Sequence, residues 1–164
     1  MKKIKIIYGV LLIILFSSTV TAQISKAEIR ATGLTCSMCS NAINKQLKSL
    51  TDVVEVQTDL NTNTFTVTLK EGNILNPKIF KEQVEKAGFF IGSLVLTTKL
   101  NTLKQSNYVL VNEDTTKNSN DIQIQVLDKG YVTDKEFKKL SKSLKNIATY
   151  TANNEDDFHI KIIN

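Results

Sequence analysis

The chain has 164 residues, which is enough for one ordinary domain or for two small ones. Its formal net charge is +5, and without the three lysines at positions 2, 3 and 5 the charge falls to +2. Tryptophan is absent, and basic residues are not interleaved with aromatic residues as on a nucleic-acid-binding surface. Composition and charge therefore argue against a nucleic-acid partner.

Residues 1–22 have the pattern of a signal peptide. Three lysines form a basic start, Ile6 to Phe16 is apolar, and residues 20–22 supply the small side chains that signal peptidase accepts. We expect cleavage between Ala22 and Gln23. The apolar run is shorter than the ~20 residues that cross a bilayer, although an uncleaved anchor is the alternative. The sequence therefore predicts an exported protein, periplasmic or extracellular, without stable membrane insertion after cleavage.

Residues 28–97 change repeatedly between two hydrophobic periods. Polar and apolar residues alternate over 28–32, which predicts a strand, and apolar residues then recur at helical spacing from Cys39 to Leu50. Segments 53–60 and 65–69 predict two strands joined by the short polar turn 61–63. A strand, a helix and a β-hairpin are thus expected in succession.

A second helix and a final strand complete this pattern. Asn76 is the predicted N-cap, Pro77 occupies the first helical position, and Gly88 is typical of the residue that follows a helix. The segment 89–96 predicts the last strand. The fold class expected for residues 24–98 is therefore α+β, a ferredoxin-like βαββαβ sandwich.

The remainder predicts a small C-terminal α+β unit over residues 105–164. Polar residues 97–106 read as a linker, and strands are expected at 108–111, 122–127 and 158–162, with a polar turn between the first two. Thr133 or Asp134 can cap a helix that carries Phe137, Leu140 and Leu144. One interpretation of this order is a degenerate partial repeat of residues 29–69.

Both cysteines lie in the stretch 33–39, where a strand is expected to end and a helix to begin. Gly33 allows the backbone to bend, and a spacing of three places Cys36 and Cys39 on one side of the first helical turn. The N–H groups of a helix start stabilise thiolates and lower a cysteine pKa below ~8.5. Two thiolates suit a soft cation such as Cu(I), because structural zinc usually takes four protein ligands.

The stretch 33–39 resembles the Gly-Met-Thr-Cys-x-x-Cys signature of the heavy-metal-associated domain family. The resemblance extends over about residues 28–96, with two departures, since Leu34 replaces the usual Met and Phe89 stands where bacterial copper members often carry Tyr. The family includes copper chaperones, modules of copper-transporting P-type ATPases and periplasmic mercury-binding proteins. The resemblance implies that Cys36 and Cys39 bind a metal ion and pass it to a protein partner by thiolate exchange.

The sequence thus predicts an exported, non-enzymatic metallochaperone that holds Cu(I) between Cys36 and Cys39. The same pair would also accept Hg(II) or Ag(I), since two thiolates satisfy any of these soft ions. A Hg(II) scavenger, a thiol-disulfide exchange protein, a local disulfide staple and an interaction module with a secondary metal site remain alternatives. The two thiols are within disulfide reach if they oxidise outside the cytoplasm.

Two further side chains could bear on the site. Met38 lies between the cysteines, and we expect it to shield the site or contact a partner rather than bind the metal. His159 is the only histidine, and its alternation with Phe158 and Ile160 predicts an outward-facing surface side chain. The alternative for His159 is a third metal ligand, supplied if the C-terminal unit folds over the loop.

Overall fold

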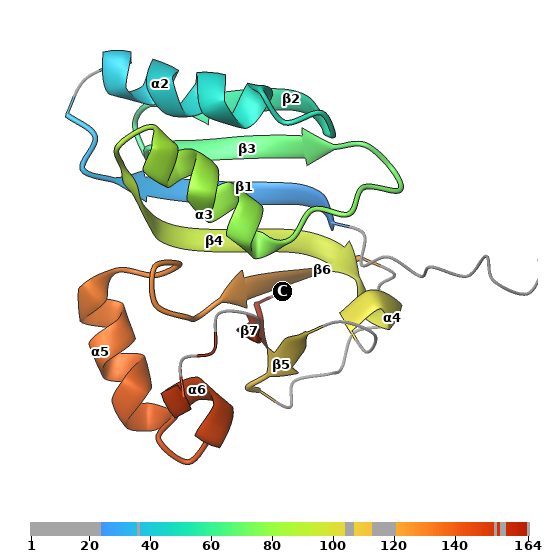
Figure 1. Cartoon of the computed structure of the whole chain (residues 1–164), viewed down its shortest axis with the longest axis vertical. Helices are drawn as coiled ribbons and strands as arrows, with labels where there is room; N and C mark the ends of the chain where they lie inside the picture. Colours follow the sequence, from blue (N-terminus) through green and yellow to red (C-terminus); the bar gives the residue numbers. More distant parts are fainter. Residues whose placement is uncertain are drawn as a thin grey trace, which may run out of the picture.

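A computed structural model describes residues 24–35, 37–103, 107–112, 121–152, 154 and 157–163. Over these ranges the chain has a mixed α+β fold on one seven-stranded sheet, in the order β2-β3-β1-β4-β6-β7-β5 (Figure 1). The predicted signal peptide, Cys36 and most of the predicted turn between 111 and 122 lie outside the described residues. None of the described helices is both long enough and apolar enough to span a membrane.

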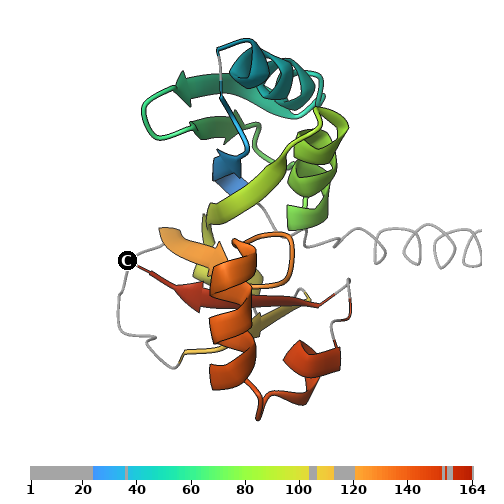
Figure 2. The same ribbon diagram turned by 90° about the vertical axis from the view of Figure 1, so that its left-hand side faces the viewer.

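The first half of the chain has the predicted order of elements. These are β1 (Ile24–Thr32), α2 (Ser37–Lys48), β2 (Val53–Asp59), β3 (Thr64–Leu69), α3 (Pro77–Lys86) and β4 (Phe90–Lys99). β1 lies between β3 and β4 and is antiparallel to both. Helices α2 and α3 cover the same face of these strands, as the two perpendicular views show (Figures 1 and 2).

The core of this half follows from the two hydrophobic periods. In β3 the buried residues alternate with threonines that face the other side of the sheet. Helix α2 buries Ile43 and Leu47, and α3 buries Phe80 and Val84. Each of these large apolar side chains contributes about 1.5–3 kcal/mol when fully removed from water. Burial on one stripe of each helix therefore fixes both helices on the sheet.

Helix α3 begins and ends where the sequence predicts. The Asn76 side chain accepts a hydrogen bond from the backbone N–H of Ile79 at 3.3 Å, and Pro77 is the first helical residue. Gly88 has φ = +87°, the left-handed conformation in which glycine follows a helix. The predicted cap and stop signals of this helix are confirmed.

The prediction of a linker over residues 97–106 is wrong for its first residues. β4 continues to Lys99 and a short helix, α4 (Leu100–Leu103), follows. The reason is long-range pairing, because residues 95–99 of β4 pair antiparallel with residues 121–125 of β6 (Asp121–Val126). Polar composition indicated a loop, whereas hydrogen bonds to a distant strand keep this segment extended.

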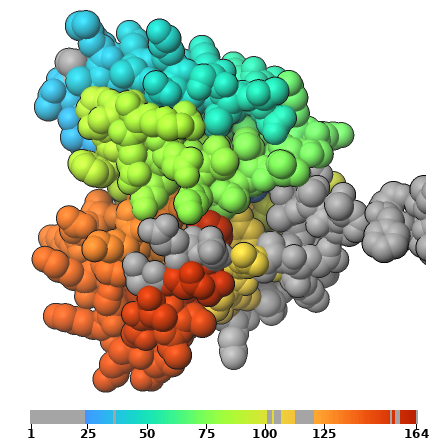
Figure 3. All heavy atoms as spheres, in the orientation of Figure 1, coloured from blue at the N-terminus to red at the C-terminus, as the bar shows by residue number. Residues whose placement is uncertain are grey.

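The C-terminal strands continue the same sheet. After β6 come α5 (Asp134–Ser143), α6 (Ala148–Ala152) and β7 (Phe158–Ile162), which is antiparallel to β6 and parallel to β5 (Tyr108–Leu110). Thr133 caps α5, since its hydroxyl accepts from the N–H of Glu136 at 3.3 Å. The space-filling view shows α3 and the C-terminal part meeting across one face (Figure 3). The boundary of a separate C-terminal domain stays a prediction.

His159 is buried, so the prediction of a surface side chain is wrong. It is 1% exposed, with Nδ1 2.7 Å from Oδ1 of Asp128 and Nε2 2.9 Å from Oγ1 of Thr149. Its backbone N–H also donates to Oδ2 of Asp128 at 2.7 Å. Burial raises the pKa of the Asp128 carboxyl above its ordinary value, while the hydrogen bonds from His159 lower it. The histidine is therefore a fully engaged core residue.

Period two does not predict the burial of His159, because β7 is covered on both sides. Phe158, His159 and Ile160 are all buried in succession. The ring of Tyr150 in α6 meets the histidine ring edge-on, with centroids 5.0 Å apart. Helix α6, which the sequence did not predict, supplies the cover on the second side.

Replacement of Asp128 by alanine should destabilise the fold by about 3 kcal/mol, because it leaves a buried imidazole N–H and a backbone N–H without an acceptor. Denaturant unfolding monitored by circular dichroism would measure the change. Asp134→Ala is the matched control, since Asp134 is exposed at the start of α5 and should cost about 0.3–1 kcal/mol. Equal losses in the two variants would contradict a structural role for the Asp128 and His159 pair.

Candidate metal site

A sharp bend joins the end of β1 to the start of α2. β1 ends at Thr32 and α2 starts at Ser37, with Gly33 at φ = +85° between them. A side chain at this φ would be strained, so glycine is the residue that allows the chain to leave the sheet in this direction. The bend directs the following residues to the N-terminal end of α2.

Cys39 lies in the first turn of α2 and is partly buried. The next residue, Ser40, is buried, whereas Met38 is 79% exposed. Cys36 directly precedes the helix and lies outside the described residues. The structure therefore places one of the two predicted ligands at the helix start, and the geometry of the thiol pair stays a prediction.

The charge distribution along α2 favours anionic sulfur at its N-terminal end. No acidic residue lies in the first turn of this helix, and Lys45 and Lys48 lie in the last turn. The unpaired N–H groups and the positive end of the helix dipole would stabilise a thiolate there, and no carboxylate of that turn opposes it. A thiolate is the form of cysteine that binds metals.

Two apolar residues connect the loop between β1 and α2 to the hydrophobic core. Leu34 and Phe89 both pack against the hydrophobic core. A Cβ placed on Gly33 would lie 3.9 Å from the ring of Phe89, so this ring is directly beside the bend. Leu34 thus faces inward, where an exchange with the Met of the resembled signature conserves volume.

The other residues considered from the sequence do not join the loop in a cluster. Both ring nitrogens of His159 are engaged by Asp128 and Thr149, which leaves no observation in favour of a third-ligand role. Among the described residues, no group of three or more His, Cys, Asp or Glu side chains could hold a metal ion. A site in this loop therefore depends on the two cysteines.

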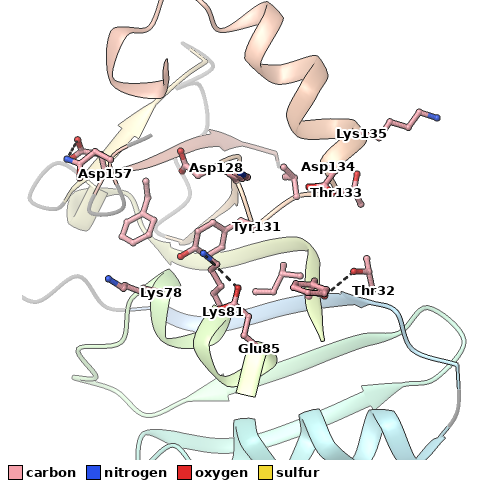
Figure 4. A pocket seen from close by; sticks show the side chains of 17 residues that line it. Thr32, Lys78, Lys81, Glu85, Asp128, Tyr131, Thr133, Asp134, Lys135 and Asp157 are labelled. Carbon is pink, nitrogen blue, oxygen red and sulfur yellow. Dashed lines mark hydrogen bonds and ion pairs between the residues drawn. The ribbon is translucent and has the colours of Figure 1, made fainter. Parts of the chain in front are cut away.

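A cleft of about 820 Å³ runs between α3 and the segment 128–135, and sequence reasoning missed it. Lys81 of α3 pairs with Glu85 at 3.9 Å, and its Nζ lies 5.7 Å from the centre of the Tyr131 ring (Figure 4). Thr32, the residue before the bend, also lines the cleft and donates to the carbonyl of Phe90 at 3.3 Å. The C-terminal part therefore reaches the base of the loop.

No local signal in the sequence could have revealed this cleft. Its walls come from several separate segments between Thr32 and Phe158, which the pairing of β4 with β6 brings together. Lysines and carboxylates line it in mixture, so neither charge sign prevails. The mixture gives no basis for assigning a ligand to the cleft.

Comparison with known proteins gives matches for the first half of the chain. Residues 28–90 match the model of the heavy-metal-associated domain. The yeast copper transporter domain Ccc2a, solved in the apo and Cu(I)-loaded states, is 36% identical, with 39% of this chain and 86% of that chain covered and a TM-score of 0.36. A search of curated proteins gives no match.

Two further solved structures have similar coverage. A copper-binding domain from HMA7, a P-type ATPase, is 31% identical over 39% of this chain and 85% of that chain, with a TM-score of 0.36. The N-terminal domain of a potential copper-translocating P-type ATPase from Bacillus subtilis, in the Cu(I)-loaded state, is 30% identical. The match covers 41% of this chain and 82% of that chain, with a TM-score of 0.36.

The matched segment contains the complete loop, both helices on the sheet and the start of β4. All three TM-scores lie below 0.5, and it is the sequence match that identifies the domain. Through residues 28–90, this chain belongs to the heavy-metal-associated domain family.

Proposed function

We propose that this chain is an exported, non-enzymatic heavy-metal-binding protein that holds one Cu(I) ion between Cys36 and Cys39 and exchanges it with a protein partner. The observation that carries the proposal is the coincidence of two features. The family match spans residues 28–90, and within it Cys39 occupies the first turn of a helix that follows a glycine bend. Sequence and family thus support the pair of Cys36 and Cys39, and the local geometry supports Cys39.

The donor set fits a soft, low-coordinate ion. Two thiolates suit Cu(I), whereas a closed zinc site needs about four protein ligands, and the described residues offer no further cluster. Ag(I) and Hg(II) have the same preference for sulfur, so the pair would also hold these ions. Copper is the ion that we propose as the physiological cargo.

Exposure of the loop suits transfer of the ion. Gly33, Thr35, Ser37 and Met38 are all exposed, so a partner can approach the sulfurs from solvent. Exchange then proceeds as a thiolate of the partner bonds to the ion and one thiolate of this chain leaves it. The exposed Met38 is expected to shield the site or contact the partner, because its flexible thioether adapts to different apolar surfaces.

The reduced chain should bind one Cu(I) ion, and conversion of either Cys36 or Cys39 to serine should abolish stoichiometric binding, since a neutral hydroxyl does not replace a thiolate. Native mass spectrometry under anaerobic conditions, with Cu(I), Zn(II) and Hg(II) in competition, would measure this. Met38→Leu is the matched control and should retain the ion. Stoichiometric copper in the double serine variant would show that the site assignment is wrong.

Gly33→Ala should weaken Cu(I) binding by up to about tenfold, because a residue with Cβ pays about 1–2 kcal/mol to hold the positive φ of the bend. Gly72→Ala is the control. Gly72 also has a positive φ, of 74°, and a Cβ there would meet nothing within 4 Å. Gly72→Ala should lower the free energy of unfolding without changing the copper affinity measured by chelator competition. An unchanged affinity in Gly33→Ala would indicate that the bend does not shape the site.

Export should remove residues 1–22, so protein recovered from expressing cells should begin at Gln23. Intact mass and N-terminal sequencing of the periplasmic and membrane fractions would test this. Ala22→Arg is the control variant, because signal peptidase requires a small residue before the cleaved bond. A full-length mass for the unaltered protein would instead indicate a retained anchor.

A further inference from the structure

Five exposed lysines lie along one side of α5 and the turn after it. They are Lys135, Lys138, Lys139, Lys142 and Lys145, here called the lysine face. Spacings of three, four and seven residues place them on one side of the helix, opposite Phe137. Phe137 packs on Tyr150, with ring centroids 5.9 Å apart. The helix thus turns its apolar side to the protein and its lysines to solvent.

The charge of the lysine face is only partly offset within the described part of the chain, since α5 has five lysines on and just after it against two acidic residues, Asp134 and Glu136. The ion pairs found there join Lys26 to Glu28, Lys81 to Glu85 and His159 to Asp128, and none involves the lysine face. Like charges three or four positions apart destabilise a helix by about 0.2–0.5 kcal/mol per pair. An external anionic surface would remove this repulsion.

Helix stability alone does not account for the positions of these lysines. Lys142 near the C-terminal end complements the helix dipole, but Lys135 lies in the first turn, where a positive charge opposes the dipole. Lys138 and Lys139 lie in the middle, where the dipole has little effect, and Asp134 and Glu136 of the first turn are their nearest acidic residues on the helix. The face therefore has more positive charge than the helix itself requires.

The composition of the face distinguishes between kinds of anionic partner. Specific protein interfaces are enriched in Tyr, Trp and Arg and depleted in Lys. The lysine face contains no aromatic residue and no arginine, since the only arginine of the chain is Arg30 in β1. Lysine is a hydrated point charge on a flexible stem, which suits diffuse attraction to lipid headgroups.

We propose that the lysine face binds electrostatically to bilayers that contain anionic phospholipid. The apolar side of α5 stays on the protein, so the chain rests on the headgroups without insertion. Helices α2 and α5 lie toward opposite ends of the long axis in both views (Figures 1 and 2). The lysine face and the loop of Cys39 are therefore separate parts of the surface. This inference does not depend on metal binding.

Vesicle flotation with the chain from Gln23 onward tests the proposal without metal. Binding is expected to phosphatidylcholine vesicles that contain phosphatidylglycerol, not to pure phosphatidylcholine, and high salt should reverse it. Loss of a lysine should weaken binding about fivefold, so Lys138→Gln, Lys139→Gln and Lys142→Gln together should weaken it on the order of one hundredfold. The contributions of the individual lysines to the binding free energy add, because all five contact the same bilayer surface.

The matched control carries Lys45→Gln, Lys48→Gln and Lys86→Gln, which remove the same charge from exposed positions on α2 and α3. It should retain most of the binding, and circular dichroism should show both variants folded. Equal weakening in the two variants would overturn the proposal in favour of net charge alone. Absence of binding to phosphatidylglycerol vesicles would also overturn it. Lysine-dependent binding to polyglutamate without vesicle binding would assign the face to an acidic protein instead.

Discussion

The pairing of β4 on both of its edges is the constraint on which the rest of the structure depends. β4 pairs with β1 over residues 90–98 and with β6 over residues 95–99, so a single strand belongs to both halves of the chain. Its Leu94 and Leu96 are fully buried in the shared core. Without β6, the N–H and C=O groups of this edge would need another partner. The family domain and its C-terminal extension are therefore one continuous sheet.

The same strand connects the sheet to the loop. Phe90, the first residue of β4, accepts the hydrogen bond from Thr32, and Gly33 then turns the chain away. The helix that receives it is held by buried Ile43 and Leu47 and by a 2.8 Å hydrogen bond from Asn44 to the hydroxyl of Thr58 in β2. An exposed loop on a rigid helix would combine access for a partner with fixed ligand positions, as the proposed function requires.

Features encoded by neighbouring residues could be predicted from the sequence. The alternation of Phe65, Val67 and Leu69 is set by the pleat of one strand, and the caps Asn76 and Thr133 act within one helical turn. The bend at Gly33 and the position of Cys39 at a helix start have the same local origin. Local stereochemistry is sufficient for these features because no distant partner decides them.

Features that need a distant partner could not be predicted. The extension of β4 to Lys99 depends on hydrogen bonds to a strand more than twenty positions away. The burial of His159 depends on Asp128 and on the cover supplied by Tyr150 of α6. The polar composition of residues 97–106 and the alternation around His159 are real features of the sequence. Each describes a single segment, so neither can indicate which other segment will pack against it. The cleft beside Thr32 has the same origin in the meeting of the two halves.

The central claim is that two sulfurs of this loop hold a soft metal ion. X-ray absorption spectroscopy at the copper edge, on the anaerobically reduced chain with one equivalent of Cu(I), tests it most directly. Copper should have a first shell of two sulfur atoms, and this shell should disappear in the Cys36→Ser, Cys39→Ser double variant. A nitrogen neighbour from His159, or a sulfur shell that persists in the double variant, would contradict it.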